Sequence, residues 1–493
     1  MKKFLSTLLA LIMALSLGIS VHAAEGDITI TIPDNGHTYK YYQIFTGTIV
    51  TNAETNEEEL TEIKWGADGI GSTGTGVDAA TLEALVALNG TDAANGEAIM
   101  AYVSGSGTVF DASRVAAVAP GYYLIEDVTN VQGMDDFVSL YVVRVCKSVT
   151  VSPKGDKPEI KKKVKDINDS AGTALTDWQD SADYDIGDTV PFQLTATMPD
   201  TFDGYSAYKV AFHDTLSKGL TFQPQGGLTV MIGNNDVTNS FVVNSEINNE
   251  TGITTLVISC DNILAPTVGA TPGCSIVVEF NAVLNNQAVI GSAGNPNEVY
   301  LEYSNNPYDE TTPSTGRTPT DKVIVFTYKV VVNKADESGA ALTGAGFTLY
   351  KKDASVEGED KYVIVGSEIT GNNMTTFTWT GLDDGDYKLV ETTVPANYNK
   401  MEDQFFTVTA EHDVESDDPA LTSLSGDAVT GSVIIFTSDS AAGSLTSTII
   451  NKSGAVLPET GGVGTTIFYI LGSLLVVAAG ILLITKKRMA SRN

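Results

Sequence analysis

Apolar and polar residues alternate over most of this chain. The alternation is clearest in five short segments, residues 28–34, 122–128, 275–280, 328–334 and 445–452. They are rich in Val, Ile, Thr and Tyr and are broken by Gly, Asn and Asp, a pattern typical of antiparallel strands with one buried face. Residues 78–103 differ, because their apolar positions are spaced as in short helices. We therefore predict an all-β chain of sandwich or barrel domains, with short helices in the first domain.

Two stretches of distinct composition divide the chain. Residues 151–163 combine Pro with dense Lys, and residues 305–322 have the composition of a Pro/Thr/Asp linker. A chain of 493 residues is too long for one core and about right for three domains. The predicted domains are residues 24–155, 156–320 and 321–455, followed by a C-terminal segment, 456–493.

The two ends of the chain carry targeting signals. Residues 1–23 begin with Lys2 and Lys3, continue through an apolar stretch and finish with a small-residue cleavage site, which predicts a signal peptide cut after Ala23. A membrane anchor is the alternative for this segment. Near the other end, the uncharged residues 465–485 are long enough to span a bilayer, and the basic tail after them would stay in the cytoplasm.

Composition narrows the classes of function. The chain has 61 acidic and 29 basic residues, and its net charge of −32 excludes a general nucleic-acid binder, which needs a basic face. Three cysteines and four histidines argue against a disulfide-rich fold and a zinc site, so we expect no metal and no cofactor. Cys260 and Cys274 lie at the ends of two strands that could pair as a hairpin. The two cysteines could form a disulfide, or each could be a separate thiol in the core.

Three polar residues lie in the apolar phase of strands in the last predicted domain. They are Lys334, Glu391 and Asn451. Residues two positions apart share a face of a strand, so these side chains should face the core. In a dry core a neutral amine is a nucleophile, and a protonated carboxyl can polarise an amide carbonyl. The set could form a Lys–Asn isopeptide bond with loss of ammonia; a strand-end Lys–Glu pair with an Asn turn is the alternative.

The middle domain has a corresponding set in the apolar phase of its strands. Its members are Lys162, Asp214 and Asn297. Strand phase favours them over their neighbours Lys161, Lys163 and Asn295. The alternative for the lysine cluster is a solvated run of charge beside a linker.

The five residues before the C-terminal span change its interpretation. They are Leu457, Pro458, Glu459, Thr460 and Gly461. This LPETG motif, the apolar span and the basic tail together resemble the cell-wall sorting signal of Gram-positive surface proteins. The resemblance implies that sortase, a cysteine transpeptidase, cleaves between Thr460 and Gly461, holds the threonyl carbonyl as a thioester and passes it to an amine. The span would then retain the chain in the membrane only temporarily.

The last domain resembles the Cna-B-type domain of the same class of surface proteins. The resemblance rests on residues 330–353 and 385–398, and the second segment places Glu391 on the glutamate of the family's E-box. The loop that follows is one residue longer than in the family's pattern. The resemblance implies an isopeptide bond between Lys334 and Asn451, assisted by Glu391.

The middle domain resembles the Cna-A-like middle domain of major pilins. The similar segments read KPEIKKKV, VAFHDTLSKGLTF and GNPNEVYLEYSNNP. The resemblance implies an isopeptide bond between Lys162 and Asn297, with Asp214 as the assisting acid. It also implies that the domains are tandem immunoglobulin-like β-sandwiches.

The first domain ends in a motif that resembles the pilin motif of sortase-assembled pili, V-x-V-Y-P-K-N. Residues 149–155 read VTVSPKG, with Ser152 in place of Tyr and Gly155 in place of Asn. The resemblance implies that the amine of Lys154 accepts the threonyl group of the next subunit, whereas a solvated charge is the alternative. Glu126 lies in an E-box-like strand without convincing Lys and Asn partners, so we predict no internal bond there.

Together these features predict the shaft-forming subunit of a covalent pilus, secreted and anchored to the cell wall of a Gram-positive bacterium. The expected partners are further copies of the chain, pilin-type and housekeeping sortases, minor pilins, peptidoglycan and unidentified host or microbial ligands. One alternative is a wall-anchored monomeric adhesin, or a minor or basal pilin, in which Lys154 is inert. Another is a wall-anchored surface enzyme, for which the sequence offers no catalytic constellation beyond the self-acting Lys–acid–Asn sets.

Overall fold

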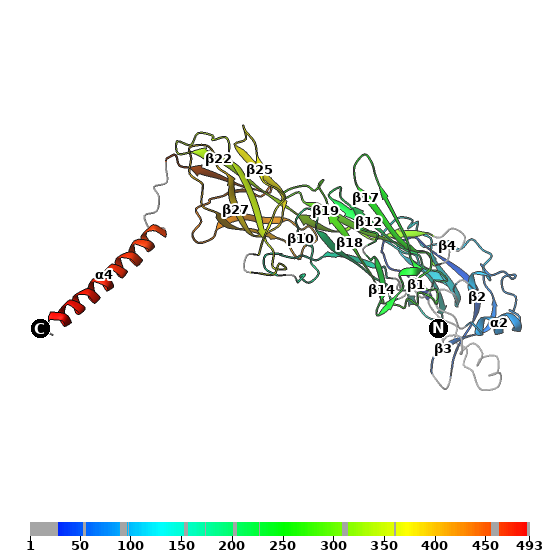
Figure 1. The fold of residues 1–493 in the computed structure, drawn as a ribbon. Helices are drawn as coiled ribbons and strands as arrows, with labels where there is room; N and C mark the ends of the chain where they lie inside the picture. Colours follow the sequence, from blue (N-terminus) through cyan, green and yellow to red (C-terminus); the bar gives the residue numbers. More distant parts are fainter. Residues whose placement is uncertain are drawn as a thin grey trace.

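The computed structural model describes residues 28–490, except 53–55, 89–95, 97, 152–155, 173, 201–204, 226, 308–313, 359–360 and 455–462. Within these residues the strands form six sheets. The sheets build three β-sandwiches, which we call the first, middle and third sandwich and which lie in a row in chain order (Figure 1). The all-β fold class predicted from the alternation is confirmed.

The first sandwich combines a short sheet with a longer one. The short sheet has the order β5-β1-β8, and the longer sheet has the order β3-β2-β6-β7 with β4 paired to β2. The helix α2 begins after Asp78, whose carboxylate accepts the backbone N–H of Thr81 (2.9 Å) and caps the helix. The elements are β1 (Ile28–Thr31), β2 (Tyr39–Thr51), β3 (Glu58–Trp65), α2 (Ala79–Val86), β4 (Thr108–Val109), β5 (Val115–Val118), β6 (Gly121–Asp127), β7 (Leu140–Val145) and β8 (Val149–Thr150).

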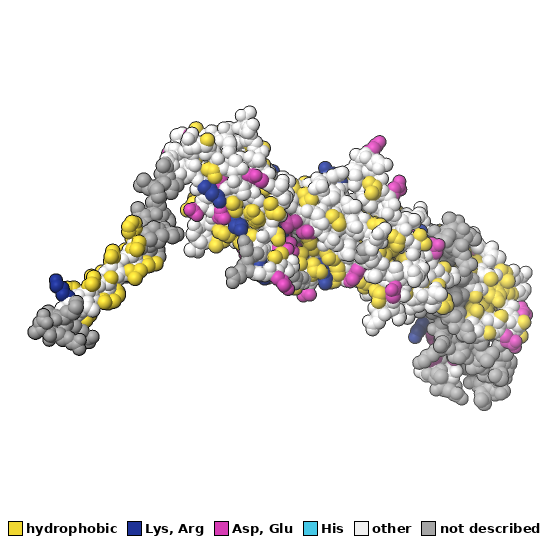
Figure 2. Space-filling model, viewed as in Figure 1, with side chains coloured by type: hydrophobic (Ala, Val, Ile, Leu, Met, Phe, Trp, Pro, Cys, Tyr) yellow, Lys and Arg dark blue, Asp and Glu magenta, His cyan; other side chains and the backbone are white. Residues whose placement is uncertain are grey.

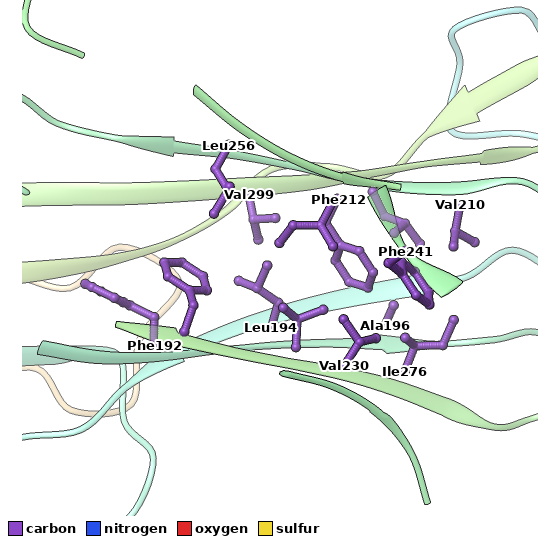
Figure 3. Close-up of a cluster of buried hydrophobic side chains, with 14 of the residues drawn as sticks. Phe192, Leu194, Ala196, Val210, Phe212, Val230, Phe241, Leu256, Ile276 and Val299 are labelled. Carbon is purple, nitrogen blue, oxygen red and sulfur yellow. The ribbon is translucent and has the colours of Figure 1, made fainter. Parts of the chain in front are cut away.

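The middle sandwich encloses a continuous apolar core between two sheets. Their orders are β10-β21-β19-β12-β17-β16, with β20 on β19, and β15-β14-β18-β11-β9, with β13 on β18. Phe192 and Leu194 of β11 face Phe212, Leu256 and Val299 of the opposite sheet (Figure 3). The elements are β9 (Glu159–Val164), β10 (Ser181–Asp183), β11 (Thr189–Thr197), β12 (Val210–Leu216), β13 (Leu220–Phe222), β14 (Thr229–Ile232), β15 (Asn235–Asp236), η2 (Thr238–Ser240), β16 (Val242–Ile247), β17 (Thr254–Cys260), β18 (Ser275–Leu284), β19 (Asn295–Ser304), β20 (Thr315–Arg317) and β21 (Asp321–Phe326).

The third sandwich brings its first and last strands together. Its sheets have the orders β26-β22-β31-β30 and β24-β23-β27-β28-β29, with β25 on β23. β22 and β31 are parallel, and their register sets Lys334 opposite Ile449. The elements are β22 (Tyr328–Asp336), β23 (Gly346–Lys352), β24 (Tyr362–Ile364), β25 (Ile369–Thr370), β26 (Thr376–Leu382), β27 (Gly385–Thr393), β28 (Gln404–His412), β29 (Leu421–Ala428), β30 (Thr437–Asp439) and β31 (Ser444–Asn451).

One strand serves two sandwiches. We expected residue 321 to begin the third domain, but β21 pairs with β10 and β19 in the middle sandwich. Its side chains alternate between two cores: Val323 and Val325 lie in the middle core, whereas Ile324 and Phe326 lie in the third core. The structure therefore moves this boundary to the end of β21. Alternation along the sequence could not show it, because both faces of the strand are apolar.

The stretch predicted as a linker, residues 305–322, also has a structural role where it is described. Its strand β20 pairs with β19 and touches the first sandwich. The backbone N–H of Gly133 donates to the carbonyl of Thr315 (2.7 Å), and the N–H of Arg317 donates to the carbonyl of Met134 (3.1 Å). The junction between the first and middle sandwiches is therefore fixed by backbone hydrogen bonds.

Among the described residues, one apolar helix lies beyond the sandwiches. Helix α4 (Val463–Ala490) includes residues 468–487, which have a mean hydropathy of 2.4 and are long enough to cross a membrane. None of this window is buried against the rest of the chain. The cores of the three sandwiches therefore do not depend on the helix for their packing.

The cysteines are free thiols, so the disulfide considered between Cys260 and Cys274 is not formed. That pairing required their two strands to form a hairpin. Instead β17, which ends at Cys260, pairs with β12 and β16, whereas β18, which follows Cys274, pairs with β11, β13 and β14. The two strands lie in opposite sheets of the middle sandwich.

The shared strand predicts separable effects of two neighbouring substitutions. Phe326→Ala should leave a cavity in the third core and cost about 3–5 kcal/mol, the usual range for a buried phenylalanine. Val325→Ala should remove two methyl groups from the middle core at a cost of roughly 2 kcal/mol. Calorimetry should show that the variants lower different thermal transitions. If both lowered the same transition, the division of β21 between two cores would be wrong.

The free thiols predict the result of alkylation. Protein denatured without reductant should take up three alkyl groups per chain, because all three cysteines are unpaired. Intact mass gives the count, and a parallel sample treated with reductant is the control. Uptake of a single group in the unreduced sample would show that two of the thiols are joined.

Candidate functional sites

The first site lies inside the middle sandwich. Lys162 of β9 and Asp214 of β12 are fully buried, and the lysine amine donates a hydrogen bond to the aspartate carboxylate. The amine lies 5.4 Å and 5.3 Å from the ring centres of Phe192 and Phe280. These rings shield the pair from water, so its electrostatic interactions act in a medium of low dielectric constant.

Burial changes the proton balance of this pair. Burial lowers the pKa of Lys162, and the charge of Asp214 opposes that shift only in part. Burial raises the pKa of Asp214, against opposing effects of Lys162 and Asn297. Both shifts favour the uncharged forms. The site therefore favours a neutral amine, which has a free lone pair, beside a protonated carboxyl, which can donate a hydrogen bond.

Asn297 completes the first site. It is buried on β19, which pairs with β12. Its amide lies close enough to the carboxyl of Asp214 to lower the pKa of that group. Neither polar atom of the Asn297 amide has a hydrogen bond of normal geometry. Asn295 differs, because its amide accepts the N–H of Val289 (2.8 Å) and donates to the carbonyls of Val289 and Val325 (3.1 Å each). The amide of Asn295 therefore stabilises the local backbone, whereas the amide of Asn297 has no such hydrogen bonds and can react with the lysine.

The neighbouring lysines are placed differently from Lys162. Lys161 is exposed. The amine of Lys163 forms ion pairs with Asp180 (2.8 Å) and with Glu415 of the third sandwich (3.1 Å). Of these three lysines, only Lys162 lies inside the core.

The second site lies in the third sandwich, where Lys334 of β22, Glu391 of β27 and Asn451 of β31 are all buried. Asn451 Nδ2 donates to Glu391 Oε1 (2.7 Å), and Glu391 Oε2 accepts the N–H of Met401 (2.8 Å). The Lys334 amine donates to the carbonyl of Ile449 (3.1 Å), the residue opposite it on β31. Asn451 Oδ1 has no hydrogen-bond partner. The carboxyl thus orients the amide while the amide oxygen stays available for protonation.

The amine of the second site is also shifted toward its neutral form. Burial lowers the pKa of Lys334 to about 8, although the charge of Glu391 opposes the shift. At pH 7 roughly one such amine in ten is neutral, against fewer than about one in a thousand for an ordinary lysine. Lys334 is therefore a far better nucleophile than a lysine on the surface.

Each site holds the reactants of an amide exchange. A neutral lysine Nζ can attack the asparagine Cγ, so that the Nζ–Cγ bond forms as the Cγ–Nδ2 bond breaks. The carboxyl group can accept the proton that Nζ loses and pass it to the leaving nitrogen, which departs as ammonia. The carboxyl ends as it began, and the fold supplies the proximity that the reaction needs.

Other predicted site residues lie outside the described residues. These are Lys154 with its neighbours Ser152 and Gly155, and the sorting motif, residues 457–461. The strand before Lys154 is described: β8 pairs in parallel with β1, and the N–H of Val151 donates to the carbonyl of Thr31 (2.8 Å). The start of the pilin-like motif is therefore held against the first sandwich.

Glu126 has a structural contact of its own. Its carboxylate accepts the hydroxyl of Tyr42 (2.6 Å) from the neighbouring strand β2. Burial and the hydrogen bond to this carboxylate raise the pKa of Tyr42, so the phenol remains a donor. The pair connects two strands of the first sandwich.

An ionic cluster that no sequence motif predicted lies between the middle and third sandwiches. The buried amine of Lys351 forms ion pairs with Asp185 (2.6 Å), Asp383 (3.1 Å) and Asp169 (3.2 Å). Burial acts to lower the pKa of Lys351, but these carboxylates outweigh it and raise the pKa. The available signal was the close spacing of aspartates in DYD at 183–185 and DD at 383–384. It was missed because the two segments meet only in the tertiary structure.

Three segments of the chain match models of known families. Residues 186–307 match the Cna-B-like domain of Gram-positive pilin backbone subunit 2, residues 328–419 match a prealbumin-like fold domain, and residues 449–491 match the LPXTG cell wall anchor motif. The model for the middle segment is described as Cna-B-like, whereas the sequence motifs were interpreted as Cna-A-like. The anchor motif and the apolar helix α4 make the protein a cell-wall-anchored surface protein.

The chain is also similar to individual proteins. It is 28% identical over 279 residues to the trypsin-resistant surface T6 protein of Streptococcus pyogenes, a match that spans 52% of this chain and about half (46%) of that protein. The structure of the T6 backbone pilin of serotype M6 S. pyogenes aligns with 88% of this chain and 100% of its own, with 20% identity and a TM-score of 0.53. The major pilin SpaD of Corynebacterium diphtheriae aligns over 88% and 99%, with 17% identity and a TM-score of 0.47. The T6 alignment shows a shared fold.

Proposed function

We propose that this chain, a relative of the backbone pilins of Gram-positive bacteria, is the shaft subunit of a covalently polymerised surface pilus. The observation that carries the proposal is the pair of buried Lys–acid–Asn sites in a chain that ends in a cell wall anchor motif. Two cores arranged for self-cross-linking suit a wall-anchored protein that has to withstand tension and proteases. The structural pilins among its relatives agree with this role.

Polymerisation would join two ends of neighbouring subunits. Pilin-type sortase would cleave the Thr460–Gly461 peptide bond, hold the threonyl carbonyl as a thioester and transfer it to the Lys154 amine of the next copy. The first sandwich lies at one end of the row, and the chain leaves the third sandwich at the other (Figure 1). A contact between unlike surfaces of identical subunits builds an open filament when the rotation between the subunits does not close a ring. A housekeeping sortase would attach the last subunit to peptidoglycan, and minor pilins would join the same polymer.

The internal bonds would carry load along the shaft. In the third sandwich, Lys334 and Asn451 lie on the neighbouring first and last strands, β22 and β31. In the middle sandwich, Lys162 lies on the first strand and Asn297 near the end of the domain on β19. A covalent link between such strands lets tension pass the domain without separating its sheets. The property that benefits is resistance to unfolding under force and to proteases, which depends on the unfolding rate.

The two sites predict the mass of the protein. Residues 24–456, expressed alone, should be lighter than their sequence by two molecules of ammonia, and peptide mapping should join Lys162 to Asn297 and Lys334 to Asn451. Asn297→Ala and Asn451→Ala should each restore the mass of one ammonia after allowance for the substitution. Asn295→Ala is the matched control and should keep both bonds, because its amide binds backbone groups. A wild-type mass equal to the sequence would contradict the isopeptide assignments.

The acceptor lysine predicts a result in the native host. Lys154→Ala should abolish the ladder of high-mass species in cell-wall extracts, because the threonyl group would have no acceptor amine. The exposed Lys161 offers a control, since Lys161→Ala removes a nearby surface lysine and should leave the ladder intact. A persistent ladder in the Lys154 variant would refute this acceptor. Absence of any ladder in the wild type would favour a monomeric adhesin or a minor or basal pilin.

A further inference from the structure

The junction between the middle and third sandwiches concentrates negative charge. Carboxylates of both sandwiches meet there, and Figure 2 shows acidic side chains gathered in this part of the surface. The members are Asp166, Asp169, Asp183, Asp185, Asp188, Asp383 and Asp384. Among the described residues, the cationic side chains in ion-pair contact with this cluster are Lys351 and His412. One lysine and one histidine cannot balance seven carboxylates.

Three of these carboxylates are close enough to share one ion. Asp183 of β10 and Asp383, in the turn between β26 and β27, are buried, and the adjacent Asp384 is half-buried. One oxygen from each lies within 4.8 Å of the others. Two oxygens bound to one Ca²⁺ at about 2.4 Å can be at most about 4.8 Å apart, so this spacing fits one shared cation.

The partners of these carboxylates leave oxygen atoms of Asp183 and Asp384 for a ligand. Asp384 Oδ1 accepts the amide of Asn168 (2.6 Å), whereas Asp383 accepts the amine of Lys351 on Oδ2 (3.1 Å) and the N–H of Asp384 on Oδ1 (2.8 Å). His412 lies 3.6 Å from Asp183 Oδ1, beyond hydrogen-bond distance. Asp183 Oδ2 is buried and has no hydrogen-bond partner. An unpartnered buried carboxylate oxygen is costly unless something positive binds it.

A separate side chain points to the same ligand. Tyr328, the first residue of β22, is 1% exposed, and its hydroxyl makes no hydrogen bond of normal geometry. Burial, the charge of Asp183 and a side-chain hydrogen bond of less regular geometry to that carboxylate raise the pKa of this phenol, so its oxygen lies beside Asp183. A neutral phenol that donates its hydrogen to a carboxylate keeps the lone pairs of its oxygen for a cation.

We propose that Asp183, Asp383 and Asp384, with Tyr328 beside them, bind a divalent cation, Ca²⁺, at the junction of the middle and third sandwiches. The set consists of hard oxygen donors, which Ca²⁺ and Mg²⁺ prefer. A set that combines buried carboxylates with a phenol suits Ca²⁺, which accepts a flexible arrangement of ligands, better than Mg²⁺, which demands a near-ideal octahedron. The scarcity of cysteine and histidine, which argued against a zinc site, does not argue against a site made of oxygen ligands. The ion would tie β10 of one sandwich to the β26–β27 turn of the next and stiffen the junction.

The test is calcium binding by the secreted part of the chain, residues 24–456, which does not need helix α4 for its cores. Protein freed of metal with a chelator would be titrated with CaCl₂ by calorimetry in about 0.15 M NaCl, where exposed charges are screened. We expect saturable binding at one site per chain and weaker binding of MgCl₂. Tb³⁺ should replace Ca²⁺ and luminesce on tyrosine excitation, since Tyr328 and Tyr387, whose hydroxyl donates to the Asp383 carbonyl (2.7 Å), adjoin the site.

Two variants and a control decide the assignment. Asp183→Asn and Asp384→Asn should each raise the Kd for Ca²⁺ at least about tenfold and reduce the Tb³⁺ signal. The exposed Asp261, in the middle sandwich, supplies the control, and Asp261→Asn should bind as the wild type does. Circular dichroism checks the fold, and the half-buried Asp384 decides the test if the Asp183 variant does not fold. The proposal fails if the wild type shows no saturable binding, if Asp384→Asn binds unchanged, or if the control loses as much affinity. None of these results depends on polymerisation.

Discussion

Two of the three β-sandwiches enclose a lysine amine in a dry core, and this burial shapes the chemistry of both sites. Water solvates an ammonium ion far better than apolar side chains do, so burial disfavours the charge on Lys162 and Lys334. A carboxyl is buried in the same core as each lysine: Asp214 in the middle sandwich and Glu391 in the third. The carboxyl makes burial of the lysine tolerable, whereas the burial itself moves the amine toward its nucleophilic form. Readiness for reaction thus comes from the dry core, against the effect of the carboxyl.

The strand order converts this local chemistry into a property of the whole domain. Lys334 and Asn451 lie on adjacent parallel strands that are the first and last of their sandwich. A bond between them would bypass the hydrogen bonds that a pulling force would otherwise have to break. The junctions between the sandwiches are also held together by contacts between strands, but these contacts are non-covalent. β21 contributes side chains to two cores, and β20 hydrogen bonds to the first sandwich. Force along the row therefore meets few flexible connections in the described part of the chain.

Much of the fold and of the two sites could be predicted from the sequence. Period-two alternation indicated an all-β chain, and strand phase singled out Lys162, which the structure buries while Lys161 stays exposed. Three expectations differed from the structure for one reason. The boundary at 321, the linker at 305–322 and the Cys260–Cys274 hairpin each required knowing which strand lies beside which. Alternation reports the face that a side chain occupies and says nothing about the neighbouring strand.

Patterns in consecutive residues revealed the cell wall anchor, the class of fold and the polar side chains that face the cores. These properties are local, because a sorting motif and the two-residue period of a strand are each written in neighbouring positions. The three-dimensional structure was needed to show that Asn295 is hydrogen-bonded to the backbone whereas Asn297 is not, and that β21 is shared between two sandwiches. It alone brought Asp183 to within 4.8 Å of Asp383 and Asp384, two hundred positions further along the chain. Burial, hydrogen-bond satisfaction and charge crowding arise from contacts between distant segments, so no pattern along the chain records them.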